Sequence, residues 1–184
     1  MSHIEYEIRV LEIDVDDVKK KLNELGAKLV FDVLQKRYVY DFNPVLSNKW
    51  IRLRTNGKET TLTIKDVSED KVDGTKELEI VVDDFDTTNE ILGELGYKPR
   101  GVQENKRIRY DLNGVEVDID TWPGIPTYLE IEGKSEKEVF DTLESLGFSK
   151  DEATALNTQD IYEKIYNYDK VKVNYLSFDN NNWF

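Results

Sequence analysis

The chain has 184 residues, of which 39% are hydrophobic and 34% charged, with a formal net charge of −13 and no cysteine. Such a chain can build one domain with a buried core. Its acidity argues against binding to duplex nucleic acid, and the lack of cysteine excludes disulfides and thiolate chemistry. Because there is no basic-then-apolar leader and no apolar run near the ~20 residues of a membrane helix, we expect a cytoplasmic protein without a membrane partner.

Short runs that alternate apolar and charged residues dominate the first 132 residues of the chain. Alternation over four to eight residues predicts a β-strand with one apolar face. We therefore predict eight strands, over residues 4–13, 37–42, 50–54, 60–65, 76–82, 106–112, 115–120 and 128–132.

Helical periodicity separates some of these strands and follows the last one. Asp14 is a candidate N-cap for the first helix, and Gly26 follows its end. Ser135 and Glu138 have the spacing of a capping box at the start of a later helix. The predicted helices span residues 15–25, 87–95 and 135–146, with two shorter ones over 149–156 and 160–166.

Charged residues on the polar faces of the predicted strands are grouped by sign. The simplest interpretation is that each strand exposes this face to water. Neighbouring like charges repel, however, and a bound cation between the acidic pairs and a bound polyanion against the arginines would compensate. The acidic pairs are Glu5 and Glu7, Glu77 and Glu79, Asp118 and Asp120, and Glu130 and Glu132; the arginine pairs are Arg52 and Arg54, and Arg107 and Arg109.

A closed sheet would bring these charged faces together. Eight strands can form a barrel with a lumen, which becomes a wet, mixed-charge tunnel if the charged faces point inward. The apolar faces would then point outward and need helices to cover them. We therefore predict an α+β fold: a closed eight-stranded antiparallel β-barrel with helices packed outside. Carboxylates in the tunnel could hold Mg²⁺ or Mn²⁺, and arginines could bind phosphate oxygens.

Several segments follow one another in an order that resembles the CYTH family, the triphosphate tunnel metalloenzymes. The resemblance covers residues 1–168 and leaves residues 169–184 as a C-terminal extension. The segments are Glu5-Tyr6-Glu7-Ile8-Arg9, similar to an ExExK signature, then Trp50-Ile51-Arg52-Leu53-Arg54, Thr61-Leu62-Thr63-Ile64-Lys65, Lys76-Glu77-Leu78-Glu79, Asp118-Ile119-Asp120 and Leu129-Glu130-Ile131-Glu132-Gly133.

The resemblance implies roles for the charged residues of these segments. A small-molecule triphosphate, either tripolyphosphate or ATP, would be the ligand, with Mg²⁺ or Mn²⁺ as cofactor. Arg9 and Lys65 would take part in catalysis. Asp120 is the preferred aspartate for the metal-binding role, and Asp118 competes for it. The implied metal ligands are Glu5, Glu7, Asp118, Asp120, Glu130 and Glu132; the implied substrate-binding residues are Arg9, Arg52, Arg54, Lys65, Arg107, Arg109, Glu77 and Glu79.

Two positions depart from the family pattern. Arg9 stands where the family has lysine, and arginine, unlike lysine, cannot be tuned to lose its proton. Asn105 stands where the family has an inward lysine, although Arg109 lies on the same face and could supply the charge.

Three functional hypotheses fit this pattern. The first is hydrolysis of inorganic triphosphate or of a nucleoside triphosphate, which we prefer because it needs fewer special contacts. The second is class IV adenylyl cyclase activity, which converts ATP to cyclic AMP and pyrophosphate. The third is a triphosphate-binding module without turnover, motivated by Arg9 and Asn105. A β-rich scaffold without a ligand is the remaining alternative, and a homodimer is compatible with the sequence.

Overall fold

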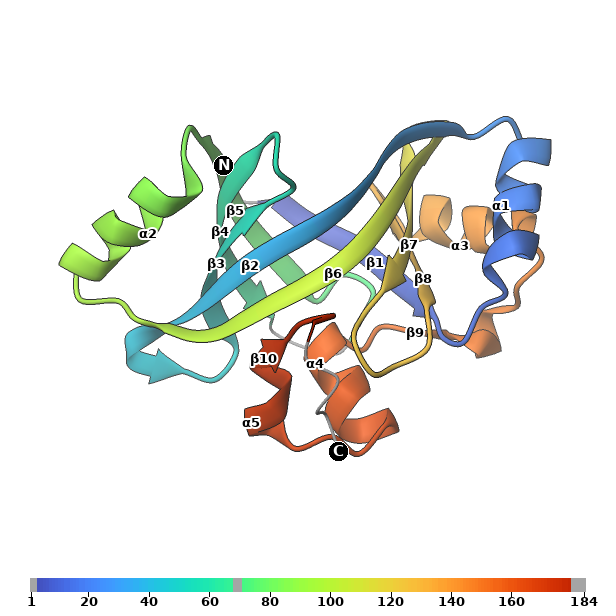
Figure 1. Cartoon of the computed structure of the whole chain (residues 1–184). Helices are drawn as coiled ribbons and strands as arrows, with labels where there is room; N and C mark the ends of the chain where they lie inside the picture. Colours follow the sequence, from blue (N-terminus) through green and yellow to red (C-terminus); the bar gives the residue numbers. More distant parts are fainter. Residues whose placement is uncertain (1–2, 68–70, 180–184) are drawn as a thin grey trace.

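The computed structural model describes residues 3–67 and 71–179 and contains a closed antiparallel barrel (Figure 1). Its strands follow one another around the barrel in the order β6-β2-β3-β4-β5-β1-β8-β7, and pairing of β6 with β7 closes the ring. The predicted fold class is therefore confirmed. The strands are β1 (His3–Val10), β2 (Lys28–Leu46), β3 (Lys49–Thr55), β4 (Thr60–Val67), β5 (Thr75–Val82), β6 (Pro99–Leu112), β7 (Val115–Thr121) and β8 (Tyr128–Gly133).

All eight predicted strands are present, but β2 and β6 begin several residues before their predicted starts. The strands are antiparallel, so the early part of each pairs with the later part of the other, from Lys28 opposite Asp111 to Tyr40 opposite Pro99. Residues 28–34 carry apolar side chains on both faces in spite of Lys28 and Asp32, and residues 99–101 contain proline and glycine, so neither segment alternates. Because alternation is what predicts a strand, the first parts of β2 and β6 could not be predicted from the sequence.

Three ten-residue helices lie outside the barrel: α1 (Val15–Glu24), α2 (Phe85–Glu94) and α3 (Glu136–Ser145). The predicted cap of α1 is confirmed, because the Asp14 carboxylate accepts the backbone N–H groups of residues 16 and 17 at 3.0 Å. Asp84 caps α2, which starts two residues before its predicted start. Within residues 3–67 and 71–179, no helix has the length and apolarity that crossing a membrane requires.

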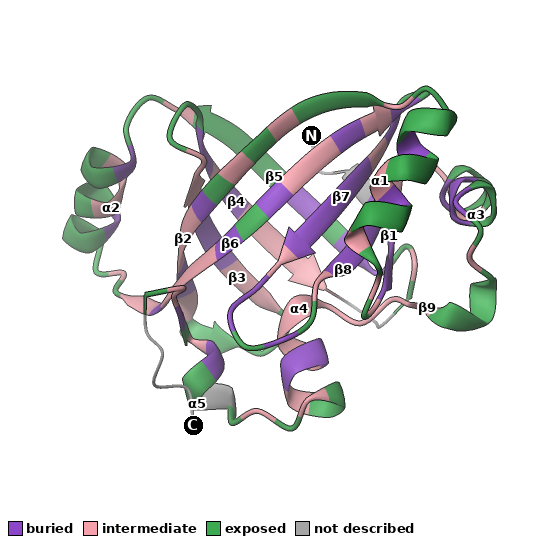
Figure 2. Cartoon of the chain, turned by 45° about the vertical axis from the view of Figure 1, so that its right-hand side comes forward, coloured by how far each residue is buried: buried purple, intermediate pink, exposed green. Residues whose placement is uncertain are grey.

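The apolar outer face of the barrel is covered on two sides by these helices (Figures 1 and 2). Leu22 of α1 and Val139 and Leu143 of α3 are fully buried against the outer faces of β1, β6, β7 and β8. On the other side, Leu92 of α2 packs on β3 and its neighbours together with Leu53. Burying a side chain of this size stabilises the fold by about 1.5–3 kcal/mol, so the helices hold the barrel from outside.

One end of the barrel is closed by residues 157–179, which we call the C-terminal cap (Figure 1). Its buried Ile161, Tyr162 and Leu176 pack on Trp122 and Tyr128 at the ends of barrel strands. The cap contains α4 (Thr158–Asp160), a π-helical turn (Ile161–Ile165), α5 (Lys170–Val173) and β10 (Tyr175–Leu176).

The structure of residues 149–179 matches the predictions from the sequence only in part. The helix predicted over residues 160–166 is present over most of that range, but the helix predicted over residues 149–156 is wrong. That segment forms a 3₁₀ turn (Lys150–Glu152) and then β9 (Ala153–Thr154), which pairs with Val10 and Arg9 of β1. Pairing with β1 outweighs the weak local helix signal. The end of the predicted extension, residues 180–184, lies outside the described residues.

The contact between the cap and β6 depends on a glycine, which gives a first prediction. A Cβ at Gly101 would lie 2.5 Å from the backbone oxygen of Asn174, so Gly101→Ala must push β10 away. We expect a loss of about 1–3 kcal/mol of stability in urea denaturation. Gly93→Ala, in α2 with nothing within 4 Å, is the control and should stabilise by about 0.5–1 kcal/mol. Wild-type stability of Gly101→Ala would contradict the packing of the cap on β6.

Candidate active site

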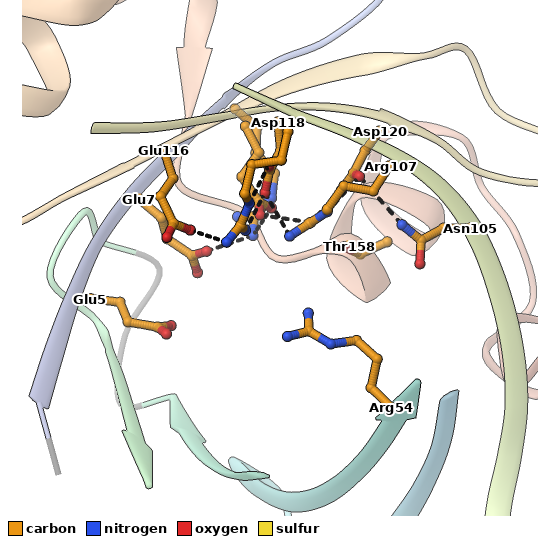
Figure 3. Close-up of polar contacts among 12 residues, drawn as sticks. Glu5, Glu7, Arg54, Asn105, Arg107, Glu116, Asp118, Asp120 and Thr158 are labelled. Carbon is orange, nitrogen blue, oxygen red and sulfur yellow. Dashed lines mark hydrogen bonds and ion pairs between the residues drawn. The ribbon is translucent and has the colours of Figure 1, made fainter. Parts of the chain in front are cut away.

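The barrel encloses a cavity of about 480 Å³ that is lined by charged side chains from its strands and by polar residues of the cap. The central expectation from the sequence, that ionic faces turn inward, is confirmed for these strands. Figure 3 shows Glu5 and Arg54 pointing into the same open space from opposite walls. The inward charged residues that are less than 10% exposed are Glu5, Glu7, Arg9, Arg52, Glu77, Arg107, Asp118, Asp120 and Glu130.

Three glutamates stand side by side on neighbouring strands and form what we call the acidic row. Strand register places Glu7 of β1 opposite Glu132 of β8, and Glu132 opposite Glu116 of β7. Opposed residues in antiparallel strands have Cα atoms about 4.5–5.5 Å apart, so these like charges repel. Burial, followed by the charges of Glu5 and Glu116, raises the pKa of Glu132 to about 8. The row is therefore a place where an added cation would be stabilising.

The next row along the barrel has two acidic residues flanked by two arginines, so it neutralises itself. Arg9 of β1 lies opposite Glu130 of β8, which lies opposite Asp118 of β7, and Asp118 lies opposite Arg109 of β6. The Arg9 guanidinium donates to Glu130 at 2.6 Å and to Glu7 at 2.9 Å. Although burial opposes ionisation, Arg9 and Arg107 hold the pKa of Glu130 well below its usual range.

Arg107 is held by three carboxylates at once. Its nitrogens lie 2.7 Å from Asp118, 2.5 Å from Asp120 and 2.9 Å from Glu130 (Figure 3). Asn105 lies beside this cluster and donates its side-chain N–H to Asp120 at 3.3 Å. The cluster is thus already satisfied internally, and little of the Arg107 charge is left for a ligand.

The opposite wall of the cavity is basic and less completely neutralised. Arg52 of β3 lies 3.3 Å from Glu79 and 3.6 Å from Glu77, whereas Arg54 has one carboxylate, that of Glu79, at 3.8 Å. The neighbouring Arg52 charge, together with burial, lowers the pKa of Arg54 to about 9. A bound anion would relieve this repulsion between the two arginines.

Lys65 of β4 stands between the two walls. Its ammonium group pairs with Glu77 and lies 3.4 Å from Glu5. Burial and the charge of Arg52 lower its pKa. It is the lysine that lines the described part of the cavity.

Most of the residues named from the sequence meet at this cavity. Asp118 and Asp120 are the exceptions, because they lie behind Arg107 and do not line the space. Their role as metal ligands stays a prediction. The named residues that line the cavity are Glu5, Glu7, Arg9, Arg52, Arg54, Lys65, Glu77, Glu79, Arg107, Arg109, Glu130 and Glu132.

The carboxylates suit a divalent cation in their chemistry but are not gathered around one point. Within residues 3–67 and 71–179, no three His, Cys, Asp or Glu side chains lie close enough together to hold a metal ion. Instead, Glu5 and Glu7 pair with Lys65 and Arg9. Carboxylate oxygens are nevertheless the ligands that Mg²⁺ and Mn²⁺ prefer. The raised pKa of Glu132 also indicates an excess of negative charge that a cation would offset.

Several residues that line the cavity were missed from the sequence. Arg37 and Gln35 on β2 face inward, as does Gln103 on β6, and Trp122 follows β7. The inward alternation of Gln35, Arg37 and Val39 was a usable signal. The predicted strand started at residue 37 and left out Gln35, and Arg37 has no second charge two residues away on the strand. The cap residues that line the cavity, Asn157, Thr158, Gln159, Asp160, Glu163 and Asn174, carried no recognisable pattern.

The family model for the CYTH domain matches residues 3–156. The chain belongs to the CYTH domain family. CYTH proteins are triphosphatases or class IV adenylyl cyclases, and the family implies dependence on a divalent metal ion. The chain is thus a CYTH enzyme that acts on triphosphates, and the cavity with its opposed acidic and basic walls is its candidate active site.

Several known proteins are similar to this chain in sequence or in fold. A Methanocaldococcus jannaschii protein named as a candidate adenylate cyclase is 28% identical over 165 residues, covering 80% of this chain and 92% of that protein. A solved Pyrococcus horikoshii structure is 25% identical with a TM-score of 0.72, covering 84% and 96%. A Hippeastrum protein described as a candidate adenylyl cyclase with dominant triphosphatase activity is 18% identical with a TM-score of 0.59, covering 89% and 96%.

The raised pKa of Glu132 gives a second prediction. Since its folded-state pKa is about 8, against an ordinary value of 4.5, ionisation is penalised in the folded protein only. Stability from this group is therefore fully present below about pH 4.5 and is lost as pH rises towards 8. Without added metal, Glu132→Gln should match wild type in urea denaturation at pH 4.5 and exceed it by about 1–3 kcal/mol at pH 9.

The control for this prediction is Glu136→Gln, which removes a carboxylate from the exposed side of α3. Its stability relative to wild type should change by less than about 0.5 kcal/mol between the two pH values. A Glu132→Gln variant whose advantage does not grow with pH would show that the acidic row is not under electrostatic stress.

Proposed function

We propose that this CYTH protein hydrolyses inorganic triphosphate or a nucleoside triphosphate in its barrel, in the cytoplasm, with Mg²⁺ or Mn²⁺. The observation that carries the proposal is the pair of opposed walls in one cavity. The acidic row repels itself, and on the other side Arg54 keeps only one distant carboxylate. A complex of a divalent cation with a triphosphate presents the charges that both walls lack.

Arg52, Arg54 and Lys65 would donate to the phosphate oxygens, because their open N–H groups line the basic side of the cavity. Glu5, Glu7 and Glu132 would hold the cation on the acidic side, with Glu130 supporting them through Arg9. When bound, the cation supplies charge neutralisation and polarises the phosphoryl oxygens. In the hydrolysis, a water oxygen bonds to the terminal phosphorus while the bond from that phosphorus to the bridging oxygen breaks.

Arg9 positions the acidic wall and cannot remove a proton from water. Its guanidinium is fixed by Glu130 at 2.6 Å, by Glu7 at 2.9 Å and by the backbone oxygen of Leu156 at 2.9 Å. Although burial opposes it, the charges of Glu130 and Glu7 raise the pKa of Arg9 further. Lys65 has the lowered pKa and is the better candidate to donate to the bridging oxygen as charge develops there.

Cyclisation is the second candidate reaction, favoured by the name of the Methanocaldococcus jannaschii relative. In that reaction the ribose 3′-oxygen would bond to the α-phosphorus, and pyrophosphate would leave. It needs a place for a nucleoside at one mouth of the tunnel. A module that binds triphosphate without turnover is the third candidate, motivated by Arg9 in place of lysine.

One assay separates the three candidates and gives the third prediction. Purified protein is incubated with Mg²⁺ or Mn²⁺ and either tripolyphosphate or ATP, and the products are measured. We expect metal-dependent release of orthophosphate. Cyclic AMP with pyrophosphate would instead establish the cyclase, and tight binding without product would establish the module.

The same assay tests the acidic wall through Glu7. Glu7→Ala should lower metal-dependent kcat by about 100-fold or more, because it removes a carboxylate from the acidic row and releases Arg9. The matched control, Glu136→Ala on the exposed side of α3, should keep wild-type kcat. Wild-type activity in Glu7→Ala would refute its place in the metal-binding wall.

A further inference from the structure

Arg37 is a cation that faces the cavity without an acidic partner. Within the described part of the chain, its side chain makes neither an ion pair nor a hydrogen bond, and its Nε is buried without an acceptor. The other arginines lining the cavity, Arg9, Arg52, Arg54, Arg100, Arg107 and Arg109, each pair with at least one carboxylate.

An aromatic ring fixes the position of this guanidinium. The Arg37 guanidinium carbon lies 4.1 Å from the centre of the Trp122 ring, and Trp122 is only 2% exposed. The ring cannot move away because it is packed against the cap beside Tyr162. This cation–π contact fixes the guanidinium but accepts none of its N–H groups, and the terminal ones are available to a ligand in the cavity.

The surroundings of Arg37 are positive. Strand register places it opposite Arg54 of β3, on the same inward face. Burial, together with the charges of Arg52 and Arg54, lowers the pKa of Arg37 to about 9, so it is still protonated at neutral pH. Arg54 has one distant carboxylate, that of Glu79, and Arg37 has none, so the two adjacent cations form a site for an anion.

Neutralisation decreases step by step along the basic wall. Lys65 on β4 has two carboxylates, Arg54 on β3 has one at 3.8 Å, and Arg37 on β2 has none. Arg37 lies directly opposite Arg54, whereas Lys65 is four residues along β4 from Thr61, the residue opposite Arg54. At about 4.8 Å per strand and about 3.3 Å per residue, the backbones of Lys65 and Arg37 are roughly 16 Å apart. In the strand order, β2 lies four positions from β1, which places Arg37 across the barrel from Glu5 and Glu7.

The cap closes the cavity next to Arg37. Gln103, opposite Arg37 on β6, donates to the backbone oxygen of Val173 at 2.7 Å. A phosphate chain that starts at the acidic row and follows the basic wall therefore ends against the cap. The Trp122 face that carries the guanidinium is not free to stack with a nucleobase.

We propose that Arg37 binds the phosphate group farthest from the acidic row and thereby makes the tunnel select three phosphates over two. This inference rests on the proposed function, because it assigns one end of the triphosphate. A diphosphate held at the acidic wall by Lys65 and Arg52 does not extend to Arg37. A triphosphate reaches it, and its terminal oxygens accept the open N–H groups of the guanidinium.

The test measures dissociation constants for tripolyphosphate, ATP and pyrophosphate with Mg²⁺ present. Trp122 and Trp50 line the cavity, so stopped-flow tryptophan fluorescence reports binding before turnover. Wild type should bind tripolyphosphate at least 10-fold more tightly than pyrophosphate. Arg37→Gln should raise the dissociation constants of tripolyphosphate and ATP by about 10- to 100-fold and that of pyrophosphate by less than about 3-fold.

Two further variants sharpen the comparison. Lys36→Gln removes the same charge from the neighbouring residue of β2, whose ammonium lies outside the barrel over Tyr38 and Phe85. It should leave all three dissociation constants within about 2-fold of wild type. Arg37→Lys keeps the charge but loses the planar fork, and should recover part of the affinity for tripolyphosphate. It also serves as the test variant if Arg37→Gln does not fold.

The outcomes that overturn the inference are distinct. If Arg37→Gln weakens the binding of tripolyphosphate and of pyrophosphate equally, Arg37 contributes only a general positive potential and does not select three phosphates. Weakening of ATP alone would place Arg37 at a nucleoside. Unchanged affinities in Arg37→Gln would overturn the assignment of Arg37 but leave the proposed function standing, whereas a wild-type protein that binds none of the three anions would overturn both.

Discussion

Charged side chains from all eight strands point into one barrel, and each must either meet an opposite charge or remain in water, because an isolated buried charge is costly. Strand register decides which of these outcomes holds. Where Glu130 and Asp118 lie between Arg9 and Arg109, two acidic residues meet two arginines and the row neutralises itself. Where Glu7 and Glu132 face one another, the signs are equal, and Arg9 pairs with Glu7 but not with Glu132. Function follows from the unbalanced rows, since only they gain from a ligand.

The same inward placement of charge determines the rest of the architecture. A barrel with a polar lumen must carry its apolar faces outside, and these would be exposed without α1, α2 and α3. The cap then separates one end of the lumen from solvent with a second apolar cluster around Trp122 and Tyr162. Reduced access of water strengthens the electrostatic interactions inside, so the cap contributes to ligand binding, and the external helices do so without touching the ligand.

The sequence predicted the barrel and most of the cavity lining because both depend on period-two alternation. It placed Glu5, Arg52 and Lys65 in one tunnel correctly, since register was not needed to decide which face they share. It could not separate charges that are free from charges that are paired. Asp118 looks equivalent to Glu132 in the sequence, but only the pairing of β6 with β7 places Arg109 beside it. Arg37 was missed for the same reason, because its isolation depends on which residues lie across from it.

The central claim is that one cavity holds a cation against the acidic row and a phosphate chain against the basic wall. Crystals soaked with Mn²⁺ and tripolyphosphate test it most directly, because the anomalous signal of manganese locates the cation independently of the phosphate density. The account predicts a manganese peak bound by Glu7 and Glu132, with phosphate density extending past Arg52 and Arg54. Manganese or phosphate found only on the outer surface of the barrel, with the tunnel charges paired as before, would contradict it.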